Sequence, residues 1–254
     1  MNFEELLTFS VTAFILTFSR LGAAAMIMPG IGDSFVSTRI RLLIALSLSF
    51  MLTPVAMQYM PSPLPSGFSL YLLIMMELII GLFIGTIMRV FMAALDTAGM
   101  VASFSSGLGN AQVFNPSFAA QGSLLGSFLS ITGVVVLFAS DLYLILIYGL
   151  VDCYKIFPVG GMPAAGDMAQ VFTKAVSASF LIGIKIATPF IIIALCLYVG
   201  MGVLARLIPQ VQVFILSLPI LILLSILTMS LILSSAMMFW MRQFQDNMAY
   251  FFSM

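Results

Sequence analysis

We single out four ionisable side chains in long apolar runs as the first candidates for a functional role. They are Glu77, Asp141, Lys185 and Arg89. Charged groups at membrane depth are costly, so they mark either proton pathways or ion pairs that hold helices together. No apolar segment carries more than one acidic residue and the chain has no His, so we expect helix pairing rather than a proton relay.

A second candidate for chemistry is the GxGD pattern formed by Gly30-Ile31-Gly32-Asp33. In intramembrane aspartyl proteases, an Asp of this pattern pairs with a second Asp to activate water. Asp96 or Asp141 would have to supply that second carboxylate. Asp33 is followed by a polar link rather than an apolar helix, however. We therefore favour a turn in which Asp33 caps the next helix, and we predict no catalytic residue and no enzyme.

Composition places the chain in the membrane. Of its 254 residues, 62% are hydrophobic and 7% are charged, whereas soluble domains carry roughly 25% charged residues. Nine basic and nine acidic residues cancel, so the sequence offers no basic face for nucleic acid.

Metal and small-molecule transport are the remaining alternatives. The 20 methionines invite a copper interpretation, but they are scattered, and Met more often fills gaps in apolar packing. Cys153 and Cys196 match no metal or redox spacing, and no inverted repeat of broken helices supports a transporter. We predict no metal site and no cofactor.

The apolar pattern predicts an all-α, polytopic membrane protein with about six hydrophobic helices, a re-entrant gate loop and a C-terminal helical hairpin. Residues 1–174 form the first part and residues 175–254 the hairpin and an interfacial tail. The predicted helices are Leu6–Met28, Leu42–Tyr59, Leu70–Leu95, Leu124–Val151 with an interruption at Asp141, Val176–Leu204 and Val213–Trp240. The residues expected at the hairpin tip, where a partner would make contact, are Arg206, Pro209, Gln210 and Gln212.

The third predicted helix carries the residues expected to pack helices closely. Gly81 and Gly85 are four residues apart, the spacing at which small residues let two helices approach in lipid, and Glu77 lies one turn earlier. We expect this face to contact other subunits.

The segment from about Ser103 to Ser127 is uncharged, rich in Gly and too polar for a good membrane span. Non-helical backbone at membrane depth is tolerated only where protein buries it or a watery cavity adjoins it. We therefore predict a re-entrant or pore-lining gate segment, the alternative being an ordinary connector. The residues expected to close the pore are Phe104, Gly107, Gly109, Val113, Phe114, Asn115, Pro116 and Phe118.

Four motifs occur in order along nearly the whole chain: Arg20 with Pro29–Gly32 and Arg39; Glu77–Gly85 with Ala98-Gly99; Leu137–Asp141 with Phe157–Gly160; and Arg206–Phe214 with Pro219. Their order and spacing resemble the FliR family of the flagellar type III export gate, which has a counterpart in virulence secretion systems. The resemblance implies a structural subunit that helps to form and seal the export channel for flagellar axial proteins.

The same resemblance implies the partners and the location. The partners would be FliP-like and FliQ-like subunits, FlhB-like and FlhA-like proteins, the lipid bilayer and, transiently, unfolded export substrates. The location would be the bacterial inner membrane, in the flagellar basal body. It also implies that the 103–127 segment contributes to the plug that closes the channel. A virulence-type (injectisome) gate subunit is the alternative within the family.

Overall fold

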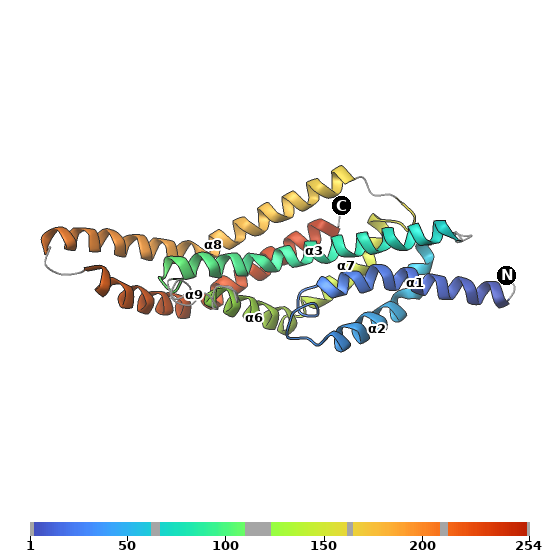
Figure 1. Cartoon of the computed structure of the whole chain (residues 1–254), viewed down its shortest axis with the longest axis horizontal. Helices are drawn as coiled ribbons and strands as arrows, with labels where there is room; N and C mark the ends of the chain where they lie inside the picture. The colour runs from blue at the N-terminus through green and yellow to red at the C-terminus, as the bar shows by residue number, and fades with distance from the viewer. Residues whose placement is uncertain (1–2, 62–66, 110–122, 162–164, 209–212, 253–254) are drawn as a thin grey trace. The chain divides into compact units, whose positions relative to one another are not determined.

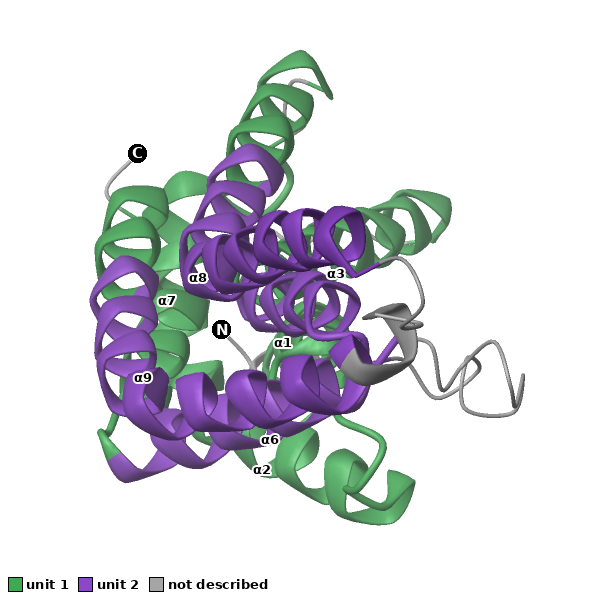
Figure 2. Cartoon of the chain, turned by 90° about the vertical axis from the view of Figure 1, so that its left-hand side faces the viewer, with its two compact units in different colours: residues 1–91, 140–175, 245–254 green, residues 92–139, 176–244 purple. Residues whose placement is uncertain are grey.

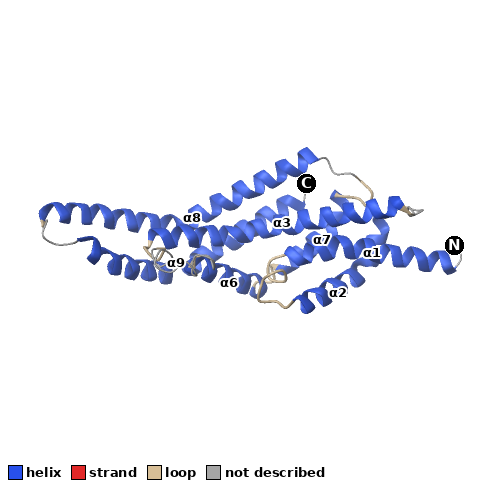
Figure 3. Cartoon of the chain, in the orientation of Figure 1, coloured by secondary structure: helices blue, strands red, loops and turns tan. Residues whose placement is uncertain are grey.

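All regular elements in the described part of the chain are helices (Figure 3). The computed structural model describes residues 3–61, 67–109, 123–161, 165–208 and 213–252. In chain order (Figure 1) the elements are α1 (Phe3–Ile27), α2 (Thr38–Ala56), the 3-10 turn η1 (Met57–Tyr59), α3 (Phe68–Ser105), α6 (Leu124–Ala139), α7 (Tyr143–Ile156), α8 (Ala165–Leu207) and α9 (Val213–Phe252). The predicted all-α class is confirmed.

Five of the described helices are long and apolar enough to cross a membrane, and α6 with α7 makes a sixth if the pair counts as one span. The chain is a multi-pass membrane protein. The break between α6 and α7 lies at Asp141, where the sequence predicted an interruption. Asp141 adopts a positive φ of 56°, a conformation that ends a helix and that Asp tolerates better than most residues.

Several predicted helix boundaries are wrong, because polar residues next to the apolar runs are also helical. Helix α3 continues past Leu95 to Ser105, because Asp96 lies at the surface of the helix and bonds to a neighbour. The predicted connector at 152–174 is helical over 152–156 and 165–174. The predicted interfacial tail continues α9 to Phe252.

The described helices divide into two compact units (Figure 2). Unit 1 comprises residues 1–91, 140–175 and 245–254, and unit 2 comprises residues 92–139 and 176–244. Helices α3, α8 and α9 each contribute residues to both units. The sequence analysis divided the chain into residues 1–174 and 175–254 by their expected functions, whereas the two compact units are defined by contacts. The division at residue 174 therefore stays a prediction.

In unit 1, α3 and α1 approach until their backbones touch. A Cβ atom built on Gly81 would overlap the carbonyl oxygen of Arg20, and one on Gly85 would lie 2.7 Å from the carbonyl oxygen of Ala24. Only glycine permits this approach, which brings many atoms of the two helices into van der Waals contact. The expectation that this face contacts other subunits is wrong for Gly81 and Gly85, because α1 of the same chain occupies it.

A buried ion pair locks the same crossing. The side chains of Arg20 and Glu77 are 0% and 1% exposed. Arg20 Nε donates to Glu77 Oε2 at 2.5 Å and Nη2 donates to Oε1 at 2.9 Å, so the pair is bidentate. Glu77 therefore pairs helices.

Helix α7 completes the environment of Arg20. Arg20 Nη1 donates to the carbonyl oxygen of Phe157 at 2.7 Å, just beyond the end of α7. The guanidinium carbon lies 4.2 Å from the centroid of the Tyr154 ring, a cation–π geometry. Arg20 thus joins α1, α3 and α7 in one buried cluster.

Unit 2 is also built on close helix contacts. A Cβ on Gly183 of α8 would lie 2.9 Å from the carbonyl oxygen of Ala94 in α3. Trp240 and Phe244 of α9 are fully or almost fully buried, with ring centroids 5.2 Å apart. The contact between Gly183 and Ala94 joins α8 to the stretch of α3 that leads into the 103–127 segment.

Replacing Gly81 by Ala should destabilise the protein, since the new methyl group has to displace the backbone of α1. We expect a loss of about 1–3 kcal/mol, the usual cost of overpacking. Thermal stability of the purified, detergent-solubilised protein measures the effect. Gly202→Ala is the matched control, because nothing lies within 4 Å of its Cβ position. Equal stability of both variants would contradict the observed packing.

Removing one member of the buried ion pair should be much more damaging than removing both. Arg20→Met leaves an unpaired buried carboxylate, which typically costs about 3–5 kcal/mol. The double variant Arg20→Met/Glu77→Met should recover part of this loss. The amount of protein that accumulates in the membrane, together with melting in detergent, tests the pattern. Single variants as stable as the unmodified protein would show that the pair is not formed.

Candidate functional site

The 103–127 segment leaves α3 through a glycine-capped helix end. Gly107 has a φ of +74°, which L-residues with a side chain rarely adopt. Its N–H donates to the carbonyl oxygen of Phe104 at 3.3 Å, and the N–H of Gly109 donates to the carbonyl oxygen of Ser103 at 3.0 Å. This arrangement resembles a Schellman motif and ends α3 at a defined residue.

The chain re-enters helical structure at Ser123. The Ser123 hydroxyl oxygen accepts a hydrogen bond from the N–H of Gly126 at 2.9 Å, which is the bonding of a helix N-cap. Helix α6 therefore begins at Leu124 because the residue before it, Ser123, caps the helix. Both ends of the segment are fixed by caps.

The two capped ends also meet each other. The N–H of Leu125 donates to the hydroxyl oxygen of Ser103 at 3.4 Å. One turn away, a Cβ on Gly99 would overlap the backbone of Gly126, so α3 and α6 touch there without intervening side chains. The described residues on the two sides of 110–122 thus meet at one place, which we call the segment base and define as Gly99, Ser103, Ser123 and Gly126.

A polar contact and a packing contact extend the base along both helices. The Ser130 hydroxyl of α6 donates a hydrogen bond to a carboxylate oxygen of Asp96. Further along α6, Gly133 lies where a Cβ would press against Leu95. On α6 the contact residues Gly126, Ser130 and Gly133 recur at helical spacing, so one face of small residues is in contact with α3.

Only part of the predicted gate lies within the described residues. Phe104 is 62% exposed, and Gly109 lies against its ring, with a Cβ on Gly109 only 2.8 Å from Phe104 Cδ1. Gly107 forms the cap described above. Val113, Phe114, Asn115, Pro116 and Phe118 lie outside the described residues. Their role as a seal stays a prediction.

Both carboxylate oxygens of Asp33, the candidate catalytic aspartate, make structural contacts. One carboxylate oxygen accepts the N–H of Gly30 at 2.7 Å, and the other forms an ion pair with Arg89. The carbonyl oxygen of Asp33 accepts a hydrogen bond from Arg41 at 2.7 Å. Asp33 holds the turn between α1 and α2. It does not cap α2, whose N-cap is Ser37, so that detail of the prediction is wrong.

The other singled-out charges are dispersed. Asp141 and Lys185 are exposed, and Arg206 is exposed in the last turn of α8, while Pro209, Gln210 and Gln212 lie outside the described residues. No group of three metal-ligating side chains occurs among the described residues. Where the structure is described, the polar contacts around the segment base hold helices and caps in place.

Sequence reasoning missed the contact between Gly99 and Gly126. Gly126 fell where the predicted gate segment and the predicted fourth helix overlap, and Gly99 lay beyond the predicted end of the third helix. The recurrence of Gly126, Ser130 and Gly133 was the available signal. It could not be used without knowing that α3 continues to Ser105.

Comparison with known proteins agrees with the predicted family. Residues 11–247 match the family described as bacterial export proteins, family 1. The chain is 34% identical to the flagellar biosynthetic protein FliR of Caulobacter vibrioides, over 94% of this chain and 95% of that protein. It is 30% identical to the FliR protein of Aquifex aeolicus, over 91% and 89% of the two chains.

A relative from Yersinia pestis matches over less of its length. The Yop proteins translocation protein T of Yersinia pestis is 31% identical over 61% of this chain and 60% of that protein. The predicted FliR family is confirmed, and the chain belongs to the bacterial export proteins, family 1.

Proposed function

We propose that this chain is a structural subunit of the bacterial type III export gate, in its flagellar form, and is needed for flagellum assembly. The observation that carries this function is the match to FliR of Caulobacter vibrioides over 94% of the chain. The Yersinia pestis relative supports a virulence-type gate as the second candidate, but over only 61% of the chain. The flagellar function is therefore better supported.

The segment base supports a physical mechanism for closing the channel. A channel for unfolded proteins has to admit varied side chains and yet block ions when idle. A compliant segment on a rigid support meets both demands. Residues 110–122 would be the compliant part, since both their ends are capped and joined at Ser103 and Leu125. Gly107 would serve as the hinge, because glycine adopts backbone conformations with positive φ that residues with a side chain rarely adopt.

Apolar side chains would complete the closure by excluding water from the constriction. Phe104, which is 62% exposed at the end of α3, is the described residue that fits this role. Val113, Phe114 and Phe118 would act with it, and Asn115-Pro116 would set the turn of the segment.

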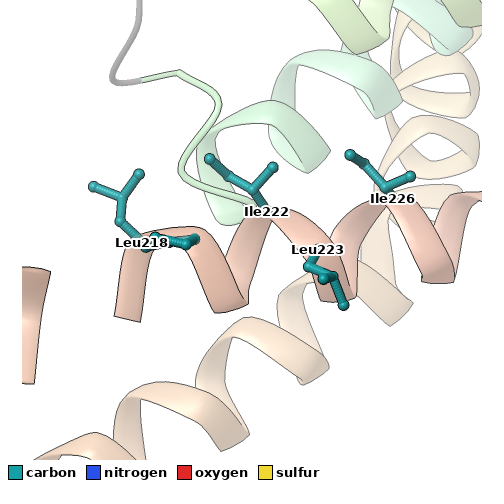
Figure 4. Close-up of a pocket in the computed structure, with 5 residues that line it drawn as sticks. Leu218, Ile222, Leu223 and Ile226 are labelled. Atoms are coloured by element: carbon teal, nitrogen blue, oxygen red, sulfur yellow. The ribbon is translucent and has the colours of Figure 1, made fainter. Parts of the chain in front are cut away.

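The chain would act within a complex. Membership of the export family supports a role in a multi-subunit apparatus, and we assign as partners the FliP-like, FliQ-like, FlhB-like and FlhA-like proteins, in the inner membrane at the basal body. The hairpin helices α8 and α9 would contact them, with Arg206, Pro209, Gln210 and Gln212 at the tip. Figure 4 shows an apolar surface hollow on α9, lined by Leu218, Pro219, Ile222, Leu223 and Ile226, that would lie on this contact face.

We assign no enzymatic role to the chain. The carboxylate of Asp33 is bound to the N–H of Gly30 and to Arg89. This argues against the protease alternative, because a catalytic aspartate has to be free to bind and activate water. Energy for export would then come from partners or from the proton gradient.

Deleting residues 110–117 should leave the complex assembled, because the segment base lies outside the deletion. We expect ion leakage across the membrane of cells carrying the variant, measured as loss of membrane potential, while export persists. Replacing the same residues by a Gly-Ser stretch of equal length is the matched control, since it keeps the length but removes the apolar side chains. A tight membrane and normal export in both variants would make the segment a mere connector.

Asp33→Asn separates the structural role of Asp33 from a catalytic one. The amide oxygen still accepts the N–H of Gly30, so the turn should survive, with a modest loss of stability from the missing charge opposite Arg89. We expect export of flagellar proteins and swimming motility to continue. Abolished function in a variant that accumulates normally would revive the protease alternative.

A further inference from the structure

Helix α2 is held to unit 1 by a narrow stripe of small residues. Its buried residues are Ala45, Ser49, Thr53 and Ala56, which recur at helical spacing. The hydroxyls of Ser49 and Thr53 donate to carbonyl oxygens one turn earlier in α2, at 2.7 and 2.6 Å. The hydroxyl groups of the stripe are therefore hydrogen-bonded within α2 itself, and the stripe occupies only one side of the helix.

The opposite side of α2 is apolar, and the described residues of this chain leave it largely exposed. Phe50 and Met51 at its middle are 77% and 75% exposed, and Leu43 nearer its start is 62% exposed. Of the five candidate spans, α2 with η1 has the smallest buried share. This exposed face needs an apolar neighbour.

The length of α2 fits a bilayer. Thr38–Tyr59 comprises 22 residues, or about 33 Å at ~1.5 Å per residue, against a hydrocarbon thickness of roughly 30 Å. Helices α3, α8 and α9 have 38, 43 and 40 residues and exceed that thickness. Helix α2 and the 19-residue span Phe9–Ile27 of α1 are thus the described spans whose lengths match lipid, and of the two α2 is the less buried, at 22% against 44%.

Basic side chains and an aromatic ring surround the start of α2. Arg41 and Arg89 both contact Asp33, so their charges lie together, and Arg39 is exposed on the first turn of α2. Three arginines against one aspartate leave a net charge of +2. Phe35, in the link before α2, is 62% exposed. Arginine and exposed aromatic side chains at the end of an apolar helix are typical of a membrane interface.

We propose that the exposed face of α2 lies against lipid acyl chains and that Arg39, Arg41 and Arg89, with Phe35, bind the headgroups of anionic phospholipids. The charge and the helix length favour lipid over a protein partner. A bilayer accounts for both features at once, because acyl chains cover the apolar face and anionic headgroups neutralise the basic cluster at its end. This lipid site is independent of the export function.

Tryptophan quenching by brominated lipids tests the proposal on the full-length chain in the assembled export complex, reconstituted in vesicles. The chain has one Trp, and Trp240 is 0% exposed, so it adds a constant background. Phe50→Trp should be quenched by brominated phosphatidylcholine. Absence of quenching would mean that protein covers α2, and would overturn the proposal.

Phe35→Trp reports on the headgroup site in vesicles of mixed composition. Brominated phosphatidylglycerol should quench it more strongly than brominated phosphatidylcholine, and added salt should reduce the preference. In the Phe35→Trp background, Arg39→Gln should lower the preference by up to about fivefold, the equivalent of ~1 kcal/mol per basic residue.

Two matched controls accompany this measurement. Arg39→Lys should retain the preference, because it keeps the charge. Arg206→Gln should leave the preference unchanged, since Arg206 lies at the end of α8. Equal quenching by the two lipids, or a preference unaffected by Arg39→Gln, would overturn the proposed headgroup site.

Discussion

The bidentate pair between Arg20 and Glu77 is the constraint on which unit 1 depends. Two charges removed from lipid and water are tolerated only when each satisfies the other, and here their oxygens and nitrogens match in two hydrogen bonds. The pair fixes the register of α1 against α3, and the remaining donor of Arg20 reaches Phe157 at the end of α7. A different register would leave both charges unpaired, so one arrangement of these helices is strongly favoured.

Glycine provides the second constraint in both units. Hydrophobic burial contributes little to helix association in lipid, because the lipid is as apolar as the side chains. Close backbone approach and polar contacts have to hold the helices instead. Gly81 and Gly85 permit this against α1 in unit 1, and Gly99 and Gly126 permit it between α3 and α6 in unit 2.

The segment base connects this packing to function. A closure that deforms during export needs fixed supports, and the Gly107 cap, the Ser123 cap and the Gly99–Gly126 contact fix the described residues on the two sides of 110–122. The same polar groups that end α3 and begin α6 therefore support the proposed gate, and none of them needs to do chemistry.

The sequence by itself determined the helical membrane class, the helix break at Asp141 and the family, because apolar runs, helix breakers and ordered motifs are local signals. It also indicated that Glu77 would pair, since an unpaired carboxylate at membrane depth is too costly. Only the tertiary structure decided that Arg20 is the partner, because the two residues are 57 positions apart in the chain. It likewise decided that α3 continues past Asp96, since the bond to Ser130 of α6 cannot be inferred from local sequence. Contacts between distant segments depend on how helices cross, which no local pattern specifies.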